Sequence, residues 1–545
     1  MSQGQNATTP SAADPQTAGT EARTALVIGG GIAGLLSALR LAQQGYAVTL
    51  AEATSVLGGA VSARYLDVPS VDTAGGEQLQ TLELDGGAEA FAVRGTAVHE
   101  LLAELGIDGR VVAPDAGRSW IHAAHGSFRA PALGLLGIPG DLDAADTLAA
   151  LSDAGLDRAR QDLRTDTSGW RAALEAGEEI TVGALVQDRM GEEVLERLVR
   201  PIVAGVHSAD PFAVDARRVA PELVEAMVEH GSLSAGVAAL RAAHAPGSAV
   251  AGLDGGMNRL TQALLSALSE AGASVLRGVR VAALKRLSDA GGWWAQISDR
   301  DEEVVRSLDA DRVVLAVDGA AAWDLLAPAS GGDLEQDDAP ALSEGVALVT
   351  LVVDHAGLDT APRGTGVLVA EDAGVAAKAL THATAKWGWL AEVVRRPDDE
   401  GLARHPHRHV LRLSYGRHGG LDPLGFRSSD EQLTDQAVED AAVLTGLPIQ
   451  ADDVVASTVV RWRACIPPQA GPDRTQFTRL LEWADRVEGL DVVGSWADGT
   501  GLAAVTAGVE RRFGRSAGAI SSPAEATHPH LGDGDVATEE KEITR

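Results

Sequence analysis

A glycine-rich turn near the N-terminus holds the first residues whose spacing could do chemistry. Residues 29–34 read Gly-Gly-Gly-Ile-Ala-Gly, the pattern G-x-G-x-x-G, and follow the apolar run Ala25–Ile28, which predicts a buried parallel strand. In such a turn Gly29 allows the tight bend, Gly31 lets the backbone approach a pyrophosphate, and Gly34 lets the next helix pack closely on the strand. The unpaired N–H groups at the start of that helix would then face the phosphates.

Glu52 adds a polar group where this kind of turn needs one. A second apolar run, residues 47–51, predicts a strand that ends at Glu52, 18 residues after Gly34. A carboxylate there can accept hydrogen bonds from the hydroxyls of a ribose. Strand, glycine turn, helix, strand and terminal Glu within a unit of about 30 residues predict a Rossmann-like dinucleotide site. A glycine turn that binds nothing explains fewer of these features.

A second strand, glycine turn and helix stand near the C-terminus. The segment 490–501 predicts a strand followed by a turn, and a helix is expected from Leu502 to Arg512. This arrangement aims a helix N-terminus at an anionic centre. In flavoenzymes that centre is the N1/C2=O edge of the ring, where charge accumulates on reduction. A purely structural strand–turn–helix is the alternative, but together with the first turn the pattern favours a flavin.

Length and charge limit the function further. A chain of 545 residues exceeds what one core usually organises, so two or three lobes are expected. The formal net charge of -32 argues against nucleic acid, and a carboxylate ligand would need local basic residues that outweigh it. The one cysteine, Cys465, excludes an internal disulfide. We expect a cytoplasmic protein without a transmembrane segment; contact with a membrane surface stays open.

Several further segments resemble one family of flavoenzymes. The pair Gly58-Gly59 follows Glu52, and the segment 85–91 (Asp-Gly-Gly-Ala-Glu-Ala-Phe) precedes Arg94. Further matching segments are residues 200–211, 364–369, 381–392 and 410–417 and the pair Arg461-Trp462. Over residues 24–514 the chain resembles the oxygen-dependent protoporphyrinogen IX and coproporphyrinogen III oxidases, which are FAD-dependent and amine-oxidase-like, and above all the soluble bacterial coproporphyrinogen III oxidases.

The chain departs from the pattern of that family at three places. Ala60 stands where a basic residue usually follows the glycine pair. His207–Ala209 stand where the family generally has Tyr-Ala-Gly, and Gln469–Pro472 stand where it usually has Tyr and Gly-His. These positions are expected near the flavin or on the strand that returns toward it.

The resemblance implies an α/β fold with a discontinuous Rossmann-like FAD-binding domain, a mixed-sheet substrate domain and a helical lobe. The FAD-binding domain is expected over residues 23–92, 247–320 and 480–514. The substrate-binding domain is expected over 93–114 and 321–479, and the helical domain over 115–246. We expect residues 1–22 and the acidic segment 515–545 to be disordered tails.

The resemblance also implies which residues contact the substrate and the cofactor. Arg94 and Lys386 are expected to bind propionate groups, because carboxylates need charge-assisted donors; alternatively, Lys386 packs with Trp387 in the substrate domain. No residue is assigned as a catalytic acid or base. The residues expected to contact FAD are Gly29, Gly30, Gly31, Ile32, Ala33, Gly34, Glu52, Gly58, Gly59, Gly87, Ala88, Glu89, Val281, Trp462, Gly499, Thr500, Gly501 and Leu502.

Three histidines form a separate pattern. His405, His407 and His409 would lie on one face of an extended strand, an arrangement that can bind zinc or copper. Arg404 and Arg408 lie among them, which is typical of an ordinary polar segment, so no metal site is predicted.

The sequence therefore predicts an FAD-dependent oxidase that converts coproporphyrinogen III to coproporphyrin III in haem synthesis, with O₂ reduced to H₂O₂. Protoporphyrinogen IX oxidation is the first alternative, since both substrates fit the same fold. An FAD-dependent amine oxidase or desaturase and a flavin-binding paralogue without catalysis are further alternatives. The expected partners are the porphyrinogen and O₂, and transient contact with a ferrochelatase stays open.

Overall fold

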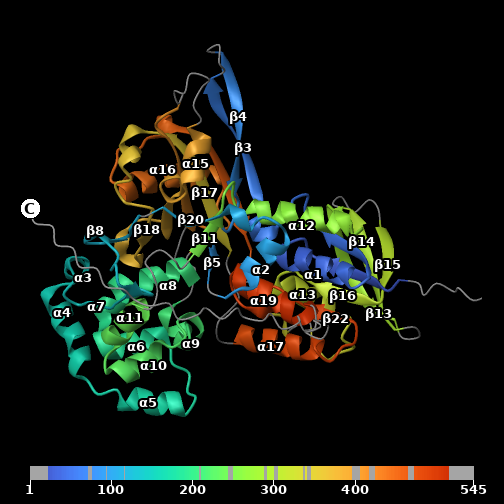
Figure 1. The fold of residues 1–545 in the computed structure, drawn as a ribbon, viewed down its shortest axis with the longest axis horizontal. Coiled ribbons are helices and arrows are strands. Elements are labelled where there is room, and N and C mark those ends of the chain that lie inside the picture. The colour runs from blue at the N-terminus through green and yellow to red at the C-terminus, as the bar shows by residue number, and fades with distance from the viewer. Residues whose placement is uncertain are drawn as a thin grey trace, which may run out of the picture.

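The structure is a computed structural model that describes most of the chain (Figure 1). The described residues are 22–71, 76–93, 95–115, 117–207, 210–242, 250–287, 291–299, 305–335, 338–340, 345–395, 405–416, 424–463 and 472–514. The two expected tails lie outside this part of the chain, except for Ala22. In the described part, no helix is both long and apolar enough to cross a lipid bilayer.

Segments far apart in the sequence meet in one five-stranded parallel sheet. Its strand order is β12-β2-β1-β16-β22, and each neighbouring pair is parallel. The strands are β1 (Thr24–Ile28), β2 (Ala47–Glu52), β12 (Ser274–Arg277), β16 (Arg312–Leu315) and β22 (Leu490–Val492). This sheet confirms the expected α/β fold class with a discontinuous Rossmann-like unit, which we call the FAD unit.

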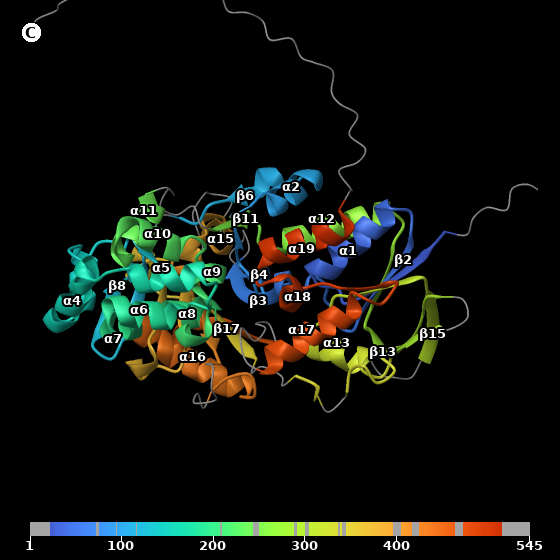
Figure 2. The same cartoon turned by 90° about the horizontal axis from the view of Figure 1, so that it is seen from below.

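Alternate side chains of β1 face two different layers of the FAD unit. Ala25 and Val27 pack in the core on one face of the sheet, and Leu26 and Ile28 pack in the core on the other face. Figure 2 shows the helices on one side of the sheet. That side holds α1 (Ile32–Gln43), α2 (Ala97–Glu104), α12 (Asn258–Glu270) and α19 (Leu502–Phe513). The other side holds α13 (Gly319–Leu326), α17 (Pro472–Ala484) and the antiparallel sheet of β13 (Val279–Arg286), β14 (Trp293–Asp299) and β15 (Val305–Ala310).

A second, mixed sheet of seven strands forms the substrate unit. Its order is β21-β17-β20-β19-β18-β7-β8, and only the β18–β7 pair is parallel among these described strands. The helix α16 (Asp430–Thr445) packs on one face, and α14 (Ala383–Lys386) and α15 (Gly388–Val394) pack on the other. The strands are β7 (Ser119–Ala123), β8 (Gly126–Arg129), β17 (Val346–Asp354), β18 (Gly366–Val369), β19 (Ala379–His382), β20 (Arg408–Tyr415) and β21 (Val454–Trp462).

A lobe of short helices lies beside the substrate unit (Figure 1). Its core is aliphatic, and strand residues Ile121 and Phe128 of the seven-stranded sheet also pack in it. The helices are α3 (Ala145–Ala150), α4 (Asp153–Ala159), α5 (Ser168–Glu175), α6 (Val182–Met190), α7 (Glu192–Val194), α8 (Arg200–His207), α9 (Ala216–Val219), α10 (Leu223–His230) and α11 (Leu233–Ala242).

A two-stranded ribbon links the two sheets. β3 (Ala63–Val71) pairs with β4 (Glu77–Asp85), and the ribbon stands away from the body at its far end (Figure 1). Its near half packs on the substrate unit, since Val68 and Leu82 share a core with Val410. The ribbon therefore carries the residues that follow β4 to the boundary between the two units. Short strands complete the fold: β5 (Phe91–Ala92), β6 (Val111–Val112) and β11 (Val250–Leu253) in one sheet, and β9 (Gly134–Leu135) with β10 (Ile138–Pro139).

The structure divides the units at different residues from those expected. We expected the helical lobe to begin at residue 115, but β7 and β8 belong to the seven-stranded sheet and the helices begin at Ala145. We expected residues 93–114 in the substrate domain, but Leu101 and Leu102 of α2 pack in the FAD unit with α1 and α19. Side chains of α13 and α17 likewise pack in the FAD unit. In each case long-range packing, which the local pattern does not report, decides the membership.

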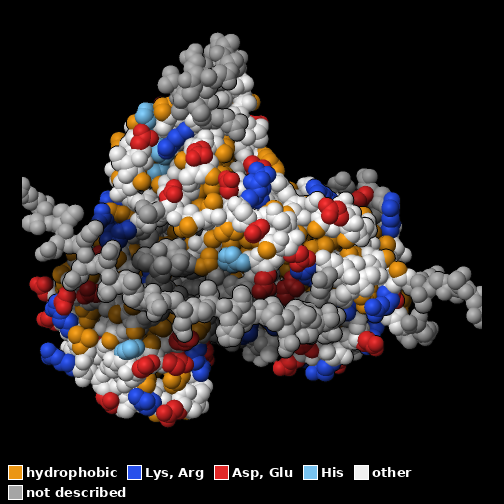
Figure 3. All heavy atoms as spheres, in the orientation of Figure 1, with side chains coloured by type: hydrophobic (Ala, Val, Ile, Leu, Met, Phe, Trp, Pro, Cys, Tyr) orange, Lys and Arg blue, Asp and Glu red, His pale blue; other side chains and the backbone are white. Residues whose placement is uncertain are grey.

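Acidic and basic side chains lie interspersed over the face of the molecule that Figure 3 shows. On this face the described acidic side chains are not gathered in one area. Any anion that binds here must find cations at a particular site, because the average surface repels it.

A buried ion pair should dominate the stability of the helical lobe. The guanidinium of Arg189 donates to the carboxylate of Asp162 over 2.7 Å, and both side chains are fully buried. Replacing Arg189 by Met leaves the Asp162 charge unpaired, so we expect the free energy of unfolding to fall by about 3–5 kcal/mol. The measurement is urea unfolding of the lobe, followed by Trp fluorescence and circular dichroism.

The matched control is Arg160→Met, which breaks the solvent-exposed Arg160–Asp143 pair. Its unfolding midpoint should stay at the wild-type value, because exposed pairs contribute little. Equal midpoints for Arg189→Met and wild type would show that the buried pair does not hold the lobe together.

Candidate active site

The glycine turn after β1 is shaped by close backbone contacts. Gly29 has a φ of +106°, and a Cβ on it would lie 2.4 Å from the carbonyl oxygen of Ala316. A Cβ on Gly34 would lie 1.9 Å from the carbonyl oxygen of Gly29. These two positions therefore require glycine for the packing of α1 against the strands, independently of any ligand.

Gly31 is different, because space lies in front of it. It is the N-cap of α1, no side chain caps the helix, and no acidic residue occupies the first turn. A Cβ on Gly31 would meet only the Cα of Gly59, at 3.9 Å. The N–H group of Gly58 donates to the carbonyl oxygen of Gly30 over 2.8 Å, which fixes the second glycine pair against the turn. The N–H groups of Ile32 and Ala33 at the start of α1 thus border a cradle built from two glycine segments, which fits a pyrophosphate.

Glu52 lies directly beside this turn. Its Oε2 accepts from the N–H of Gly30 over 2.7 Å, and its Oε1 accepts from the N–H of Thr54 over 2.8 Å. The carboxylate is therefore held in a fixed direction at the end of β2, where the sequence predicted a ribose contact. The contact of Thr54 with Glu52 was not predicted. The signal that could have found it is its place only two residues after the acidic residue.

The helix α19 begins in the same way as α1. Its N-cap, Gly501, has a φ of +90° and no side chain caps the helix. α1 follows β1 directly, and α19 follows β22 after the short helix α18 (Ser495–Asp498), so both helices lie beyond the carboxyl ends of parallel strands. The turn that contains Gly499, Thr500 and Leu502 thus offers a second helix N-terminus to a bound anion or flavin. Two uncapped helix starts at one edge fit the extended FAD molecule.

The segment that follows β4, residues 86–89, packs tightly against the FAD unit. We call it the flavin-face loop. The N–H of Ala88 donates to the carbonyl oxygen of Ala60 over 2.6 Å, and a Cβ on Gly87 would lie 2.2 Å from that same oxygen. Ala60, one of the departures noted in the sequence, therefore contacts the loop through its backbone. The Nε1 of Trp462 donates to the carbonyl oxygen of Gly86 over 2.8 Å from the other side.

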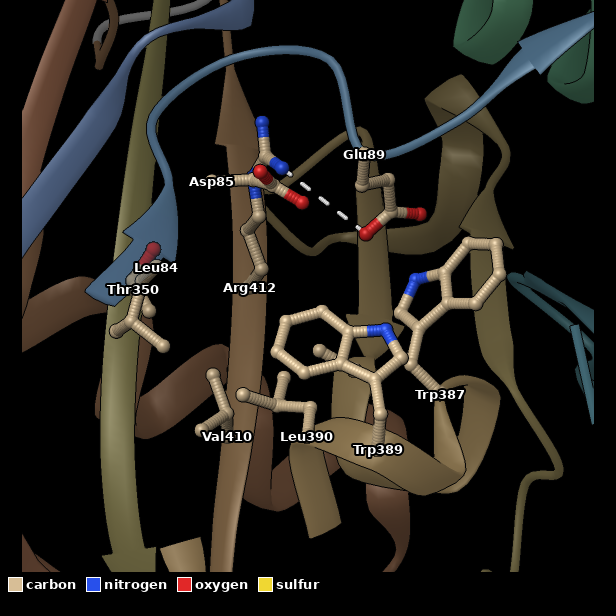
Figure 4. Close-up of a pocket in the computed structure, with 10 residues that line it drawn as sticks. Leu84, Asp85, Glu89, Thr350, Trp387, Trp389, Leu390, Val410 and Arg412 are labelled. Carbon is tan, nitrogen blue, oxygen red and sulfur yellow. Dashed lines mark ion pairs between the residues drawn. The ribbon is translucent and has the colours of Figure 1, made fainter. Parts of the chain in front are cut away.

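A pocket opens where the flavin-face loop meets the substrate unit (Figure 4). It holds about 20 Å³ of free space, room for a water-sized group, and opens to solvent. Two indole rings, aliphatic side chains and a few charged groups form its wall. The lining residues are Leu84, Asp85, Glu89, Thr350, Ala383, Trp387, Trp389, Leu390, Val410 and Arg412.

Two cations hold Glu89 at the edge of this pocket. Lys386 forms an ion pair with its Oε1. Nη1 of Arg412 lies 4.0 Å from its Oε2 (Figure 4). Burial favours the neutral acid, but Lys386 and then Arg412 outweigh it, so the pKa of Glu89 lies below its usual range. Glu89 is therefore ionised, and the two cations stay close to each other within an otherwise acidic protein.

Asp85 is the other carboxyl group of the pocket. Its Oδ1 accepts from the N–H of Met257 over 2.8 Å, next to the start of α12. Burial raises the pKa of Asp85 to about 6, although the charge of Arg412 and the N–H of Met257 act in the opposite direction. The group is therefore ionised above pH 6 and neutral below it.

The structure brings some of the predicted residues together and leaves others apart. Lys386 pairs with Glu89, which lines the pocket, whereas Arg94 lies outside the described residues. Val281 is 8% exposed and packs in the core beside β2, on the side of the sheet away from α1. Arg412 and Trp389 were missed; for Arg412 the signal was a single charge inside the apolar run 410–413. The departures at Ser208–Ala209 and Gln469–Gly471 lie outside the described residues.

Two of the three histidines meet at one carboxylate. Nδ1 of His407 lies 2.7 Å and Nε2 of His409 lies 3.0 Å from the carboxylate oxygens of Asp359, and the buried His409 also contacts His382 over 2.9 Å. His405 lies near Arg408 and Asp354. In the described part of the chain, no cluster of three or more His, Cys, Asp or Glu side chains could hold a metal ion.

Comparison with known proteins identifies the family. The model of the flavin containing amine oxidoreductase family matches residues 32–508. The chain belongs to this family. Its members use a flavin, and this chain is accordingly an FAD-dependent oxidoreductase, in agreement with the two uncapped helix starts and the glycine cradle.

The relatives of this flavoprotein include porphyrinogen oxidases. Coproporphyrinogen III oxidase of Mycobacterium tuberculosis strain H37Rv is 32% identical over 88% of this chain and 94% of its own length. Human protoporphyrinogen oxidase is 31% identical over 36% of this chain and 42% of its own length. Among solved structures, a protein from Exiguobacterium sp. 255-15, provisionally assigned as a protoporphyrinogen oxidase, shares the fold with a TM-score of 0.71 at 22% identity, over 91% of this chain and 98% of its own.

The space in front of Gly31 gives a direct test of the FAD cradle. Gly31 has a φ of -72°, which any residue adopts, so Gly31→Ala should fold normally. The added methyl group occupies the space that the pyrophosphate needs, so the Kd for FAD should rise about tenfold or more, equivalent to about 1.4 kcal/mol. Titration of the apoprotein with FAD measures it.

Gly109→Ala is the control, because a Cβ there meets nothing within 4 Å. It should bind FAD as the wild type does. If Gly31→Ala also binds FAD with the wild-type Kd, the pyrophosphate does not approach this turn.

The raised pKa of Asp85 predicts how stability depends on pH. A carboxyl group whose pKa is raised in the folded protein destabilises it above its usual pKa; the cost is absent below about pH 4 and complete above about pH 6. Asp85→Asn removes this cost, so its stability relative to wild type should rise between pH 4 and pH 7, by at most about 3 kcal/mol.

Urea unfolding of the holoenzyme across this pH range measures the difference. Asp67→Asn, which changes an exposed carboxyl group on the same ribbon, controls for the substitution itself. A difference between Asp85→Asn and wild type that does not vary with pH would contradict the raised pKa.

Proposed function

We propose that this flavoprotein is a porphyrinogen oxidase whose preferred substrate is coproporphyrinogen III. The observation that carries the proposal is the wall of the pocket at the flavin-face loop, where two indole side chains lie beside the partly exposed cations Lys386 and Arg412. A porphyrinogen is a large, mostly apolar macrocycle with carboxylate side chains, so it needs both kinds of group. The mycobacterial relative, matched over most of both chains, bears the name of this activity.

The chemistry would divide between cofactor and protein. Bound FAD supplies the acceptor for the hydrides that leave the meso carbons, with O₂ as the terminal acceptor that becomes H₂O₂. The complete reaction removes six electrons and six protons in three two-electron steps, and three O₂ become three H₂O₂. The protein's own groups bind and orient the macrocycle and keep water away from the reacting edge.

Each of these tasks can be assigned to described side chains. Trp387 and Trp389 offer apolar faces to the macrocycle. Lys386, whose side chain is 21% exposed, remains accessible to a propionate group, and Glu89 fixes its position in the absence of substrate. The ion pair with Glu89 would then be exchanged for one with the substrate, and Arg412 would remain beside the Glu89 carboxylate.

Preference for coproporphyrinogen III over protoporphyrinogen IX follows from charge. Coproporphyrinogen III carries four propionates and protoporphyrinogen IX carries two, so local cations matter more for the first in a protein with a net charge of -32. In this proposal Arg94 binds a further propionate, the enzyme works in the cytoplasm in haem synthesis, and the product passes to a ferrochelatase by transient contact. Protoporphyrinogen IX is the second candidate, supported by the partial match to the human enzyme.

Porphyrin fluorescence tests the proposal directly. The purified holoenzyme, given each porphyrinogen in air, should form coproporphyrin III faster than protoporphyrin IX, with release of H₂O₂. Lys386→Met should raise the KM for coproporphyrinogen III about tenfold or more, since it removes a charge-assisted contact. If neither porphyrinogen yields porphyrin although FAD is bound, the proposed function is rejected.

Lys285→Met is the matched control for Lys386→Met. Lys285 lies over the ring of Trp294 at 5.1 Å, much as Lys386 lies over the ring of Trp387 at 5.4 Å, but it belongs to the sheet that contains β13. Its KM should equal that of the wild type. An equal rise in both variants would show a general effect of lost positive charge instead of a propionate contact.

A further inference from the structure

Two carbonyl groups of the flavin-face loop accept hydrogen bonds from the substrate unit. The Nε1 of Trp462, at the end of β21, donates to the carbonyl oxygen of Gly86 over 2.8 Å. The Nη2 of Arg412, in β20, donates to the carbonyl oxygen of Gly87. β17 lies between these two strands in the sheet, so the donors come from separate places and converge on consecutive residues.

The FAD unit holds the same loop from the opposite side. The N–H of Gly86 donates to the carbonyl oxygen of Ser62, and the N–H of Ala88 donates to that of Ala60, over 2.8 and 2.6 Å. The 3-10 turn Gly59–Val61 contains Ala60, and Gly59 lies against Gly31 of the phosphate cradle. An unbroken series of contacts thus runs from the phosphate cradle through the loop to the substrate unit.

We propose that Arg412 and Trp462 are positioning residues that set the peptide orientation of the flavin-face loop and thereby tune the bound flavin; for Trp462 this role adds to the FAD contact that the resemblance implies. The direction of a peptide carbonyl also fixes the direction of the neighbouring N–H group and of the peptide dipole. In a buried site, such fixed dipoles act strongly on a group whose charge changes during reduction. The two donors are the side chains that hold these carbonyls from the substrate side.

Arg412 has a second contact that links the loop to the pocket. Its guanidinium lines the pocket and lies 4.0 Å from Glu89 while it donates to Gly87 (Figure 4). A planar guanidinium with five N–H donors can serve both groups at once, which the single ammonium of Lys cannot do with the same geometry. A change of charge in the pocket therefore reaches the flavin-face loop through Arg412.

The competing explanation is that both side chains only join the two units. In that case their loss would lower stability without changing the flavin. The inference concerns the bound flavin alone and does not depend on which porphyrinogen is oxidised, so it can be tested without substrate.

The experiment compares the holoenzymes of Arg412→Met, Arg412→Lys and Trp462→Phe with wild type. The flavin absorption spectrum, the midpoint potential and the Kd for FAD are measured, together with circular dichroism and the urea midpoint. We expect Arg412→Met and Trp462→Phe to shift the absorption bands and the potential and to raise the Kd about tenfold, the effect of one lost hydrogen bond to a buried group. Arg412→Lys should recover part of the shift.

Matched controls come from the other edge of the same sheet. Arg129 in β8 stacks on Trp120 in β7 at 5.6 Å, far along the strand order from β20 and β21. Arg129→Met and Trp120→Phe should leave the flavin spectrum and potential unchanged. If Arg412→Met does not fold, Trp462→Phe and Arg412→Lys still decide the question.

A double-mutant cycle tests the link to the pocket. Glu89→Gln should shift the flavin bands in the wild-type background and produce a clearly smaller shift in the Arg412→Met background, because the two changes act on one network. Additive shifts would overturn the link through Arg412. Wild-type flavin spectra and potentials in folded Arg412→Met and Trp462→Phe would overturn the positioning role, whatever the outcome of the porphyrinogen assay.

Discussion

Parallel pairing of β1, β16 and β22 is the constraint on which the rest of the site depends. Helices that follow parallel strands start at the same edge of the sheet, so the uncapped ends of α1 and α19 lie at one edge, with β16 between their strands. The strands are separated by more than a hundred residues, yet the register Val27–Val314 and Val314–Asp491 fixes their ends together. An extended dinucleotide can be held by backbone N–H groups only because this edge gathers them.

The second constraint is the tight seat of the flavin-face loop. Ala60 contacts the loop through its carbonyl oxygen, and Gly87 leaves no room for a side chain there. The ribbon of β3 and β4 leads the chain from one unit to the other and back, so this loop forms where both units meet. Its N–H groups donate to carbonyl oxygens of the FAD unit, and its carbonyl groups accept from side chains of the substrate unit, so both sides satisfy its polar backbone.

Local charge and global charge act in opposite directions in this protein. The surface average repels anions, but Lys386 and Arg412 lie together beside two indole rings and keep Glu89 ionised. Burial reduces the screening of this cluster by water, so it can act on a ligand that the outer surface would repel. The ion pairs also keep the site electrically balanced in the absence of a ligand.

The sequence by itself determined the glycine cradle, Glu52 and the strand–turn–helix at residues 490–512, because these depend on local backbone geometry and on periodicities of two and 3.6 residues. The prediction that Lys386 binds substrate also came from a local motif. Only the tertiary structure decided that Arg412 and Trp462 meet consecutive carbonyl groups of residues 86 and 87, that Asp85 is buried beside Met257, and that α2 packs on α19. Each of these contacts joins residues more than a hundred positions apart. No local pattern reports which strands become neighbours or how deeply a charge is buried.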